Sequence, residues 1–284
     1  MGGQRIENPL GIMQGRLLPK YQGRYQAHPV DNWQDEFQIA AELGLNCIEF
    51  ILDYNDYKKN PLMTTHGRQQ IQSISEQTGI RVLSVCADYF MESPLHSDDE
   101  QTATRGTEVL IDLLKAATGL SIKDIVLPCV DQSSIQTDKV RDRFTEVLLS
   151  IIPETEQYFV NLSLETDLNP SQFEKLLTVL DSPRITVNYD IGNSAALGYD
   201  YTDELRAYGE RISDVHIKDR ELGGDSVTLG SGNADIPGFF EYLSRFNYQG
   251  SFIMQTYRVD EGISVFKDQL DWLKQNVPSL WSAA

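Results

Sequence analysis

Four polar residues in the second half of the chain have types and positions that would suit a metal site. Glu165, Asp190, His216 and Gln255 each stand at or just after the end of a short apolar, strand-like segment. Carboxylate, imidazole and amide oxygen ligands suit Mn²⁺, Mg²⁺, Co²⁺, Fe²⁺ or Zn²⁺, and no sulfur atom in the set favours a softer metal. We therefore expect one divalent metal ion here, provided that the four segments are neighbouring strands.

The segments that must position these residues alternate between strand-like and helix-like patterns along the chain. Strands are expected at 10–14, 46–51, 80–86, 124–127, 161–165, 184–189, 212–216 and 251–256. Each is followed by apolar residues at helical spacing. Asn169-Pro170, for example, opens a helix that buries Phe173, Leu176, Leu177 and Leu180, and a shorter helix is expected near 203–208.

Eight such strand–helix units predict an α/β fold, a (β/α)8 TIM barrel, as a single domain over residues 1–284. Eight units in about 250 residues is the usual size of this barrel. A doubly wound open sheet is the alternative. It usually has fewer strands, and the dinucleotide-binding form carries a glycine fingerprint that Gln14-Gly-Arg-Leu17 does not match. The carboxyl ends of neighbouring barrel strands, about 4.8 Å apart, would bring the four polar residues to one rim.

Composition narrows the class of partner. The formal net charge of −18 disfavours binding to nucleic acid. No stretch reaches the roughly 18 apolar residues of a membrane span, and the N-terminal residues lack the apolar run of a signal peptide. Cys47, Cys86 and Cys129 lie in apolar segments without a close pair, so we expect reduced core residues. A cytoplasmic protein without membrane partners is predicted.

Several motifs together resemble the sugar phosphate isomerase/epimerase family of xylose-isomerase-like barrels. They are Leu-Ser-Leu-Glu165, Tyr-Asp190-Ile-Gly-Asn193, Val-His216-Ile-Lys-Asp-Arg220, Phe252-Ile-Met-Gln-Thr-Tyr-Arg258, Gly11-Ile-Met-Gln-Gly-Arg-Leu17 and Leu229-Gly-Ser-Gly-Asn-Ala-Asp-Ile-Pro237. The resemblance implies a divalent metal held by Glu165, Asp190, His216 and the residue at 255. Members of the superfamily have a second glutamate at that last position, and the two glutamates serve as acid and base on opposite faces of the sugar.

Gln255 departs from this pattern. An amide oxygen can still coordinate a metal, but an amide does not exchange a proton near neutral pH. The expected reaction is isomerisation or epimerisation of a sugar, keto-sugar or sugar phosphate through an enediolate, with Glu165 as the base. One base suffices for an aldose–ketose isomerisation. Epimerisation needs a donor on the other face, for which Glu49 and Lys218 are the candidates.

Other polar residues near the strand ends are candidates for contact with the substrate. Arg16 and Arg258 follow the first and last strands, which are neighbours in a closed barrel, and could grip an anion. Asn193 suits a sugar hydroxyl, and Glu49 ends the second strand.

Lys218 lies two residues after His216 and so faces the same side of a regular strand. It could reach a phosphate or a developing oxyanion, or it could pair with Asp190 or Asp219.

Three other functions are alternatives to a sugar isomerase or epimerase. An apurinic-endonuclease-like enzyme would need more than the four histidines present and a basic face. A dehydratase of inositol-type substrates could use the same metal ligands. A non-catalytic sugar-binding barrel would account for Gln255. The chain could form homo-oligomers, with Trp272 and Trp281 near the C-terminus available for a contact, although core packing is the preferred interpretation for Trp272.

Overall fold

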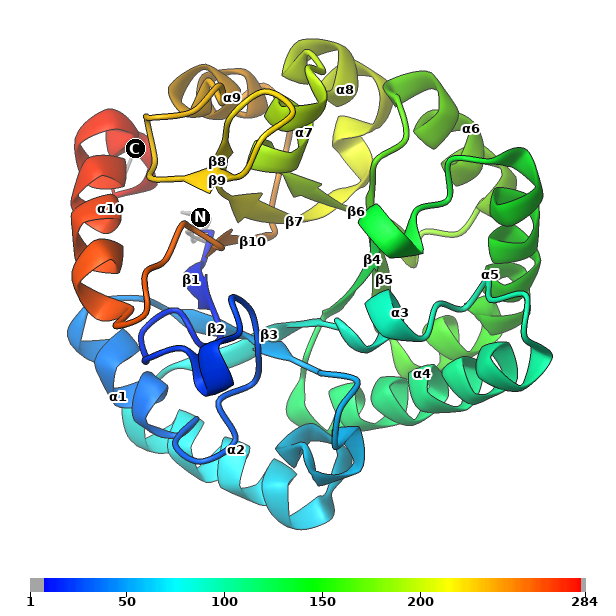
Figure 1. Cartoon of the computed structure of the whole chain (residues 1–284), viewed down its shortest axis with the longest axis horizontal. Helices are drawn as coiled ribbons and strands as arrows, with labels where there is room; N and C mark the ends of the chain where they lie inside the picture. The colour runs from blue at the N-terminus through cyan, green and yellow to red at the C-terminus, as the bar shows by residue number, and fades with distance from the viewer. Residues whose placement is uncertain (1–7, 282–284) are drawn as a thin grey trace, which may run out of the picture.

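The computed structural model describes residues 8–281 and shows eight parallel strands closed into a barrel (Figure 1). The order round the ring is β1-β10-β7-β6-β5-β4-β3-β2. The predicted (β/α)8 architecture is therefore confirmed. The ring strands are β1 (Leu10–Met13), β2 (Cys47–Ile51), β3 (Arg81–Cys86), β4 (Asp124–Cys129), β5 (Asn161–Thr166), β6 (Ile185–Asp190), β7 (Ile212–Ile217) and β10 (Ser251–Met254).

Helices surround this ring (Figure 1). They are α1 (Asp35–Glu42), α2 (Thr65–Thr78), α4 (Glu100–Leu120), α5 (Asp138–Tyr158), α6 (Pro170–Leu180), α8 (Tyr201–Tyr208), α9 (Ile236–Leu243) and α10 (Ile263–Asn276). Two shorter helices, α3 (Tyr89–Glu92) and α7 (Ile191–Leu197), directly follow the ends of β3 and β6.

Helix α6 shows how local sequence sets an element and its buried face. The Asn169 side chain accepts a hydrogen bond from the Gln172 amide, and Pro170 occupies the first turn, where its missing N–H costs nothing. Phe173, Leu176, Leu177 and Leu180 are all buried, as their spacing predicts. Burying each of these side chains contributes about 1.5–3 kcal/mol, so packing rather than helix propensity holds α6 in place.

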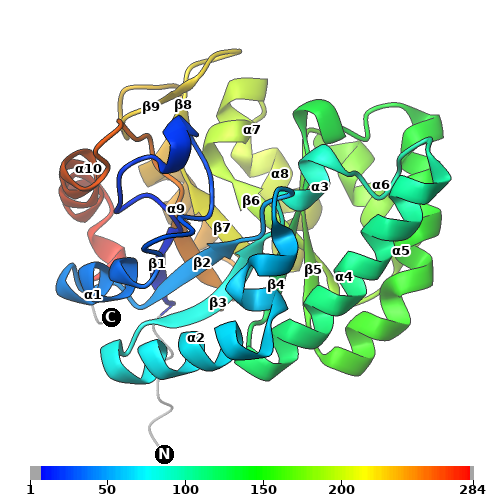
Figure 2. The same ribbon diagram turned by 60° about the horizontal axis from the view of Figure 1, so that its bottom comes forward.

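Two features of the loops were not predicted. The chain between β6 and β7 forms α7 as well as α8, where a single short helix near 203–208 was expected. After β7, the residue pairs Asp219–Arg220 and Ser226–Val227 form a small antiparallel hairpin, β8–β9. This hairpin and the loop after β1 lie at the same end of the barrel (Figure 2).

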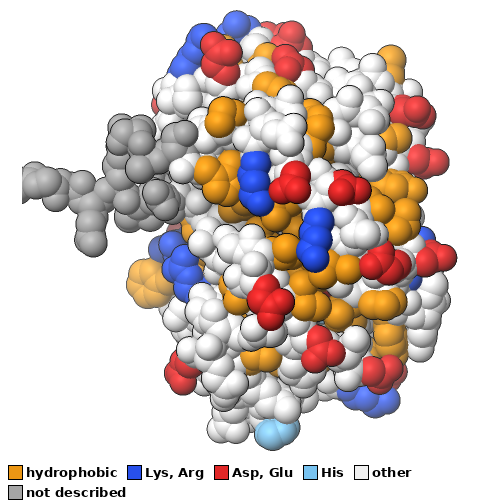
Figure 3. Space-filling model, turned by 90° about the vertical axis from the view of Figure 1, so that its left-hand side faces the viewer, with side chains coloured by type: hydrophobic (Ala, Val, Ile, Leu, Met, Phe, Trp, Pro, Cys, Tyr) orange, Lys and Arg blue, Asp and Glu red, His pale blue; other side chains and the backbone are white. Residues whose placement is uncertain are grey.

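The surface and core agree with the composition. The three cysteines are buried and unpaired, as predicted. On the face that includes α10, acidic and basic side chains are interspersed among hydrophobic ones (Figure 3). Among residues 8–281, no helix combines the length and the apolar character needed to cross a membrane.

Candidate active site

The ends of β5, β6 and β7 bring three predicted metal ligands together. Asp190 is the last residue of β6 and pairs in register with His216 on β7, while Glu165 is the second-last residue of β5. One ligand atom from each of the three lies within 4.8 Å of those of the other two. All three side chains are buried. The predicted convergence of these strand ends is therefore present in the fold.

The imidazole of His216 has a different environment at each nitrogen. Nε2 lies 2.8 Å from Glu49 Oε1 and 3.5 Å from Asp214 Oδ2. Nδ1 is buried without a hydrogen-bond partner and lies 4.0 Å from Asp190 Oδ2. If Nε2 donates its proton to Glu49, the lone pair of Nδ1 faces Asp190 and Glu165.

Lys218 is the cation of this cluster. Its Nζ donates hydrogen bonds to Asp190 Oδ2 and Gln255 Oε1, each at 2.9 Å, and to Asn193 Oδ1 at 3.1 Å. Of the partners expected from the sequence, the structure selects Asp190. Gln255 directly follows β10, so its amide reaches the cluster from the neighbouring strand through Lys218.

Helix α7 positions Asn193 between the two carboxylates. Asp190 is the N-cap of α7 and accepts a hydrogen bond from the Asn193 amide at 2.8 Å. The Asn193 side-chain amide in turn donates to Glu165 Oε1 at 2.5 Å, and its oxygen accepts from Arg220 at 2.8 Å. Asn193 therefore holds Glu165 in one orientation, which makes α7 part of the site.

The two carboxylates differ in their affinity for protons. Burial and the nearby charge of Asp190 raise the pKa of Glu165 to about 7. Burial also opposes ionisation of Asp190, but the Lys218 ammonium, His216 and the hydrogen bond from the Asn193 amide together outweigh it, so the pKa of Asp190 lies below its usual value. Two neighbouring carboxyls with separated pKa values can take different roles. Glu165 is suited to gain and lose a proton near neutral pH, whereas Asp190 stays ionised.

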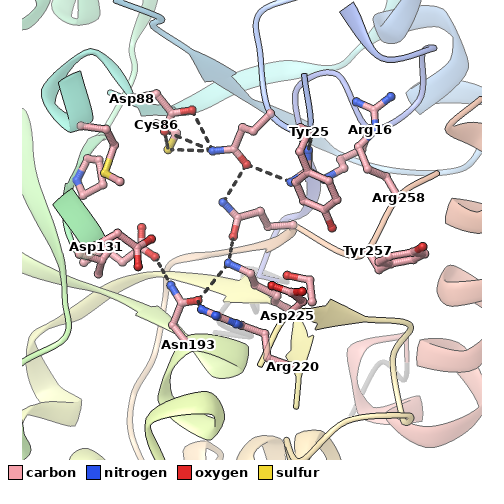
Figure 4. Close-up of a pocket in the computed structure, with 18 of the residues that line it drawn as sticks. Arg16, Tyr25, Cys86, Asp88, Asp131, Asn193, Arg220, Asp225, Tyr257 and Arg258 are labelled. Carbon is pink, nitrogen blue, oxygen red and sulfur yellow. Dashed lines mark hydrogen bonds between the residues drawn. The ribbon is translucent and has the colours of Figure 1, made fainter. Parts of the chain in front are cut away.

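A cavity of about 530 Å³ opens above this cluster, at the carboxyl ends of the strands. Glu165, Asn193, Lys218 and Gln255 line one part of it. Residues of the loops after β1 and β10 line another part, where Arg16, Tyr25, Tyr257 and Arg258 lie close together (Figure 4). The remaining lining residues are Lys20, Gln26, Cys86, Asp88, Met91, Pro128, Val130, Asp131, Arg220, Asp225 and Ser226.

Arg16 and Arg258 both line the cavity, and both also hydrogen-bond to the backbone of the loops after β1 and β10. Arg16 donates to the backbone oxygens of Tyr25 and Thr256, and Arg258 donates to those of Gly15 and Leu18. Neither forms an ion pair with a carboxylate of the described residues. Burial and the charge of Arg16 lower the pKa of Arg258 to about 10. The buried Glu36 carboxyl lies near both guanidinium groups and offsets part of their charge. Two neighbouring guanidinium groups would still favour an anion in this part of the cavity.

Glu49 is not where a substrate-binding residue must be. Its side chain is fully buried inside the barrel, it does not line the cavity, and it accepts a hydrogen bond from Ser84 at 2.5 Å. The physical reason is its place in β2, two residues before the strand ends at Ile51, so it points into the barrel below the rim. The expectation that Glu49 contacts the substrate is therefore corrected: it contacts His216 instead.

Gln26 belongs to the site although no sequence motif identifies it. Its side-chain oxygen accepts from Arg16 Nη2 at 2.9 Å and Gln255 Nε2 at 3.2 Å, while its Nε2 donates to Asp88 Oδ2 at 2.9 Å. These bonds set the Gln255 amide with its oxygen toward Lys218 (Figure 4). Gln26 lies in the irregular loop after β1, where no periodic pattern could have identified it.

The donor set fits a divalent metal ion. Two carboxylates lie beside a buried imidazole nitrogen that lacks a partner, and buried polar groups are otherwise almost always hydrogen-bonded. Oxygen and nitrogen ligands of this kind bind Mn²⁺, Mg²⁺, Zn²⁺ and similar ions. Glu165, Asp190 and His216 are the residues that would hold the ion, and the amide oxygen of Gln255, which now accepts from Lys218, is the fourth ligand expected from the sequence.

Comparison with known proteins agrees with the fold. The chain is 29% identical over 238 residues to the putative L-ribulose-5-phosphate 3-epimerase SgbU of Escherichia coli, covering 79% of this chain and 83% of that protein. It is 28% identical over 257 residues to the L-ribulose-5-phosphate 3-epimerase UlaE of Salmonella heidelberg, covering 87% and 90%. The crystal structure of the IOLI protein with a bound zinc atom superposes with a TM-score of 0.76 at 16% identity, covering 96% and 99%. The family model for the xylose isomerase-like TIM barrel matches residues 37–276, and the chain belongs to that family.

Proposed function

We propose that this protein is a divalent-metal-dependent sugar isomerase or epimerase, and specifically a 3-epimerase of a ketose or ketose phosphate. The observation that carries the proposal is the cluster of Glu165, Asp190 and His216 below a cavity, with the His216 Nδ1 atom buried and unpartnered. The similarity to proteins named L-ribulose-5-phosphate 3-epimerase supports the choice of reaction and substrate class. A zinc-bound structure of the same fold supports a metal.

Glu165 is the base in this proposal. A bound divalent ion would draw electron density from the substrate carbonyl and so acidify the neighbouring C–H group. Glu165 removes that proton to give an enediolate, since its pKa of about 7 allows both protonation states near neutral pH. Asn193 fixes the carboxylate during the transfer through the hydrogen bond to Oε1.

Lys218 is the donor on the other side. Gln255 does not exchange protons near neutral pH, and Glu49 is outside the cavity. Lys218 lies 2.9 Å from the Gln255 amide oxygen and lines the cavity, which supports its choice as the second acid–base group. It can stabilise the developing oxyanion and return a proton to the opposite face. The cationic part of the cavity around Arg16 and Arg258 suits the phosphate of a phosphorylated substrate.

The test is deuterium exchange in D₂O with a panel of free and phosphorylated ketoses. The Mn²⁺-loaded protein is expected to incorporate solvent deuterium at C3 and to yield the C3 epimer. Glu165→Gln should lower exchange about 10³-fold, within the range for loss of a general base. The matched control is Glu92→Gln, because Glu92 is an exposed carboxylate after β3 and outside the cavity lining.

The alternatives give different results. Exchange that survives Glu165→Gln would refute the role of Glu165. Loss of water from the substrate without exchange in the recovered ketose would indicate a dehydratase. Metal binding without turnover of any substrate would indicate a non-catalytic sugar-binding barrel.

A further inference from the structure

The Lys218 ammonium is bound to two of the four residues expected to hold a metal. Its Nζ lies 2.9 Å from both Asp190 Oδ2 and Gln255 Oε1, and its side chain is largely buried. Among the described residues, His216 can share a metal with Glu165 and Asp190 or with Glu49 and Asp214, and Lys218 lies beside the first of these groups. In this arrangement the lysine supplies the positive charge that the cluster requires.

The aliphatic part of the Lys218 side chain is packed in place, whereas its ammonium group has more than one hydrogen-bond partner. A Cβ atom on Gly192 would lie 2.8 Å from Lys218 Cγ and 3.0 Å from its carbonyl carbon, so the stem packs directly against α7. The ammonium, however, also contacts Asn193 Oδ1 at 3.1 Å and lines the cavity. Lys218 can therefore give up two of its hydrogen bonds and keep the third.

A divalent ion needs the oxygen lone pairs that Lys218 uses. Metal–oxygen distances are about 2.0–2.2 Å, which is shorter than a hydrogen bond and directed at the same lone pairs. The ion and the ammonium would also repel each other, because both carry positive charge. The Gln255 oxygen cannot avoid this conflict by turning, since Gln26 holds the other end of the amide.

We infer that Lys218 and the divalent ion compete for Asp190 Oδ2 and Gln255 Oε1. Lys218 neutralises the cluster when it is free of metal. When the ion binds, Lys218 loses these two bonds, remains on Asn193 Oδ1 and is released toward the substrate in the cavity. The inference rests on the metal site of the proposed function. It implies that Lys218 lowers the affinity for the ion while stabilising the metal-free protein.

The experiment measures Mn²⁺ binding by isothermal titration calorimetry, without substrate, for the whole protein and for Lys218→Met. The variant is expected to bind Mn²⁺ at least about tenfold more tightly. The control is Lys115→Met, which removes the same charge from an exposed position on α4 and should leave Mn²⁺ affinity unchanged. Lys218→Arg keeps the positive charge and should also retain the low affinity.

Thermal unfolding gives a second readout. Without metal, Lys218→Met should melt below the unmodified protein, because Asp190 loses its cationic partner. With saturating Mn²⁺ the order should reverse. Equal or weaker Mn²⁺ binding by Lys218→Met, with native circular dichroism, would overturn the inference and leave the proposed function standing. Failure of the unmodified protein to bind Mn²⁺, Zn²⁺ or Mg²⁺ would overturn both.

Discussion

Buried carboxylates lie on both sides of the His216 ring, but the two ring nitrogens differ in their hydrogen bonding. On the Nε2 side, Glu49 accepts from Ser84, and Asp214 accepts from Asn188 and Ser251, so every carboxylate oxygen there has a partner. On the Nδ1 side the imidazole nitrogen has none. Buried polar groups that are fully paired stabilise a core. A buried nitrogen left unpaired beside Glu165, which lines the cavity, is available to a metal ion.

This difference separates two buried glutamates that composition alone would treat alike. Glu49 and Glu165 both have raised pKa values, about 8 and about 7, with burial as the main cause. Only Glu165 lines the cavity. We therefore assign stability to Glu49, together with the positioning of His216, and proton transfer to Glu165. Three measurements test whether Glu49 and Glu165 differ in this way.

The largest effect should come from removing Glu49. Glu49→Ala leaves a void in the barrel and deprives Ser84 and His216 of their partner, so the free energy of unfolding should fall by about 4 kcal/mol. Glu165→Gln should change it by less than about 1 kcal/mol, because it relieves repulsion with Asp190. Urea unfolding of metal-free protein, followed by circular dichroism, measures both. Similar losses in the two variants would erase the distinction.

The second effect concerns pH. The folded protein holds protons on Glu49 and Glu165 more tightly than the unfolded chain does, since their folded pKa values of about 8 and about 7 exceed the usual 4.5. Between pH 5 and 8 the folded state therefore binds more protons, and the unfolding free energy of the metal-free protein should fall as pH rises through this range.

The two glutamates should separate in the same titration. Saturating Mn²⁺ selects ionised Glu165, so it should remove the part of the pH dependence that Glu165 contributes. Glu49→Gln should remove the part that Glu49 contributes. Urea unfolding at a series of pH values measures this, and a metal-free protein whose stability rises from pH 5 to 8 would contradict the assignment.

The smallest effects should come from removing one hydrogen bond to Glu49 and one hydrogen bond to Glu165. Ser84→Ala removes the hydroxyl that binds Glu49 and should cost about 1 kcal/mol of stability. Asn193→Ala frees Glu165 and should lower the rate of deuterium exchange about tenfold, equivalent to about 1.4 kcal/mol, while changing stability by less than about 0.5 kcal/mol. Unfolding curves and exchange rates for both variants provide the comparison. The reverse pattern would mean that Asn193 is structural.

Much of the fold was predictable because strand and helix periods are local properties of the chain. The convergence of Glu165, Asp190 and His216 was predictable too, since strand order and strand ends determine which residues meet at the rim. The position of Glu49 within its strand also predicts that it lies inside the barrel, below the rim, and the expected contact with substrate overlooks this. A residue two positions before a strand end faces the interior one layer below the rim, and Asp214, two before His216, does the same.

Other parts of the site could not be predicted. Gln26 sits in a loop whose path depends on contacts with Asp88, Arg16 and Gln255, each far away in the sequence. The role of Gln255 depends on the same contacts, because they decide which end of the amide meets Lys218. Such long-range side-chain networks leave no periodic pattern in the sequence.

The pairing of β1 with β10 has a consequence for the order in which the protein matures. Arg16 donates to the backbone of Thr256, Arg258 donates to Gly15, and Gln255 contacts Gln26, so this part of the cavity spans the seam between the first and last ring strands. During synthesis these groups emerge more than two hundred residues apart. The part of the cavity that Arg16 and Arg258 line is thus complete only when β10 has docked on β1, so the newly made chain must close its ring before these two groups face the same space.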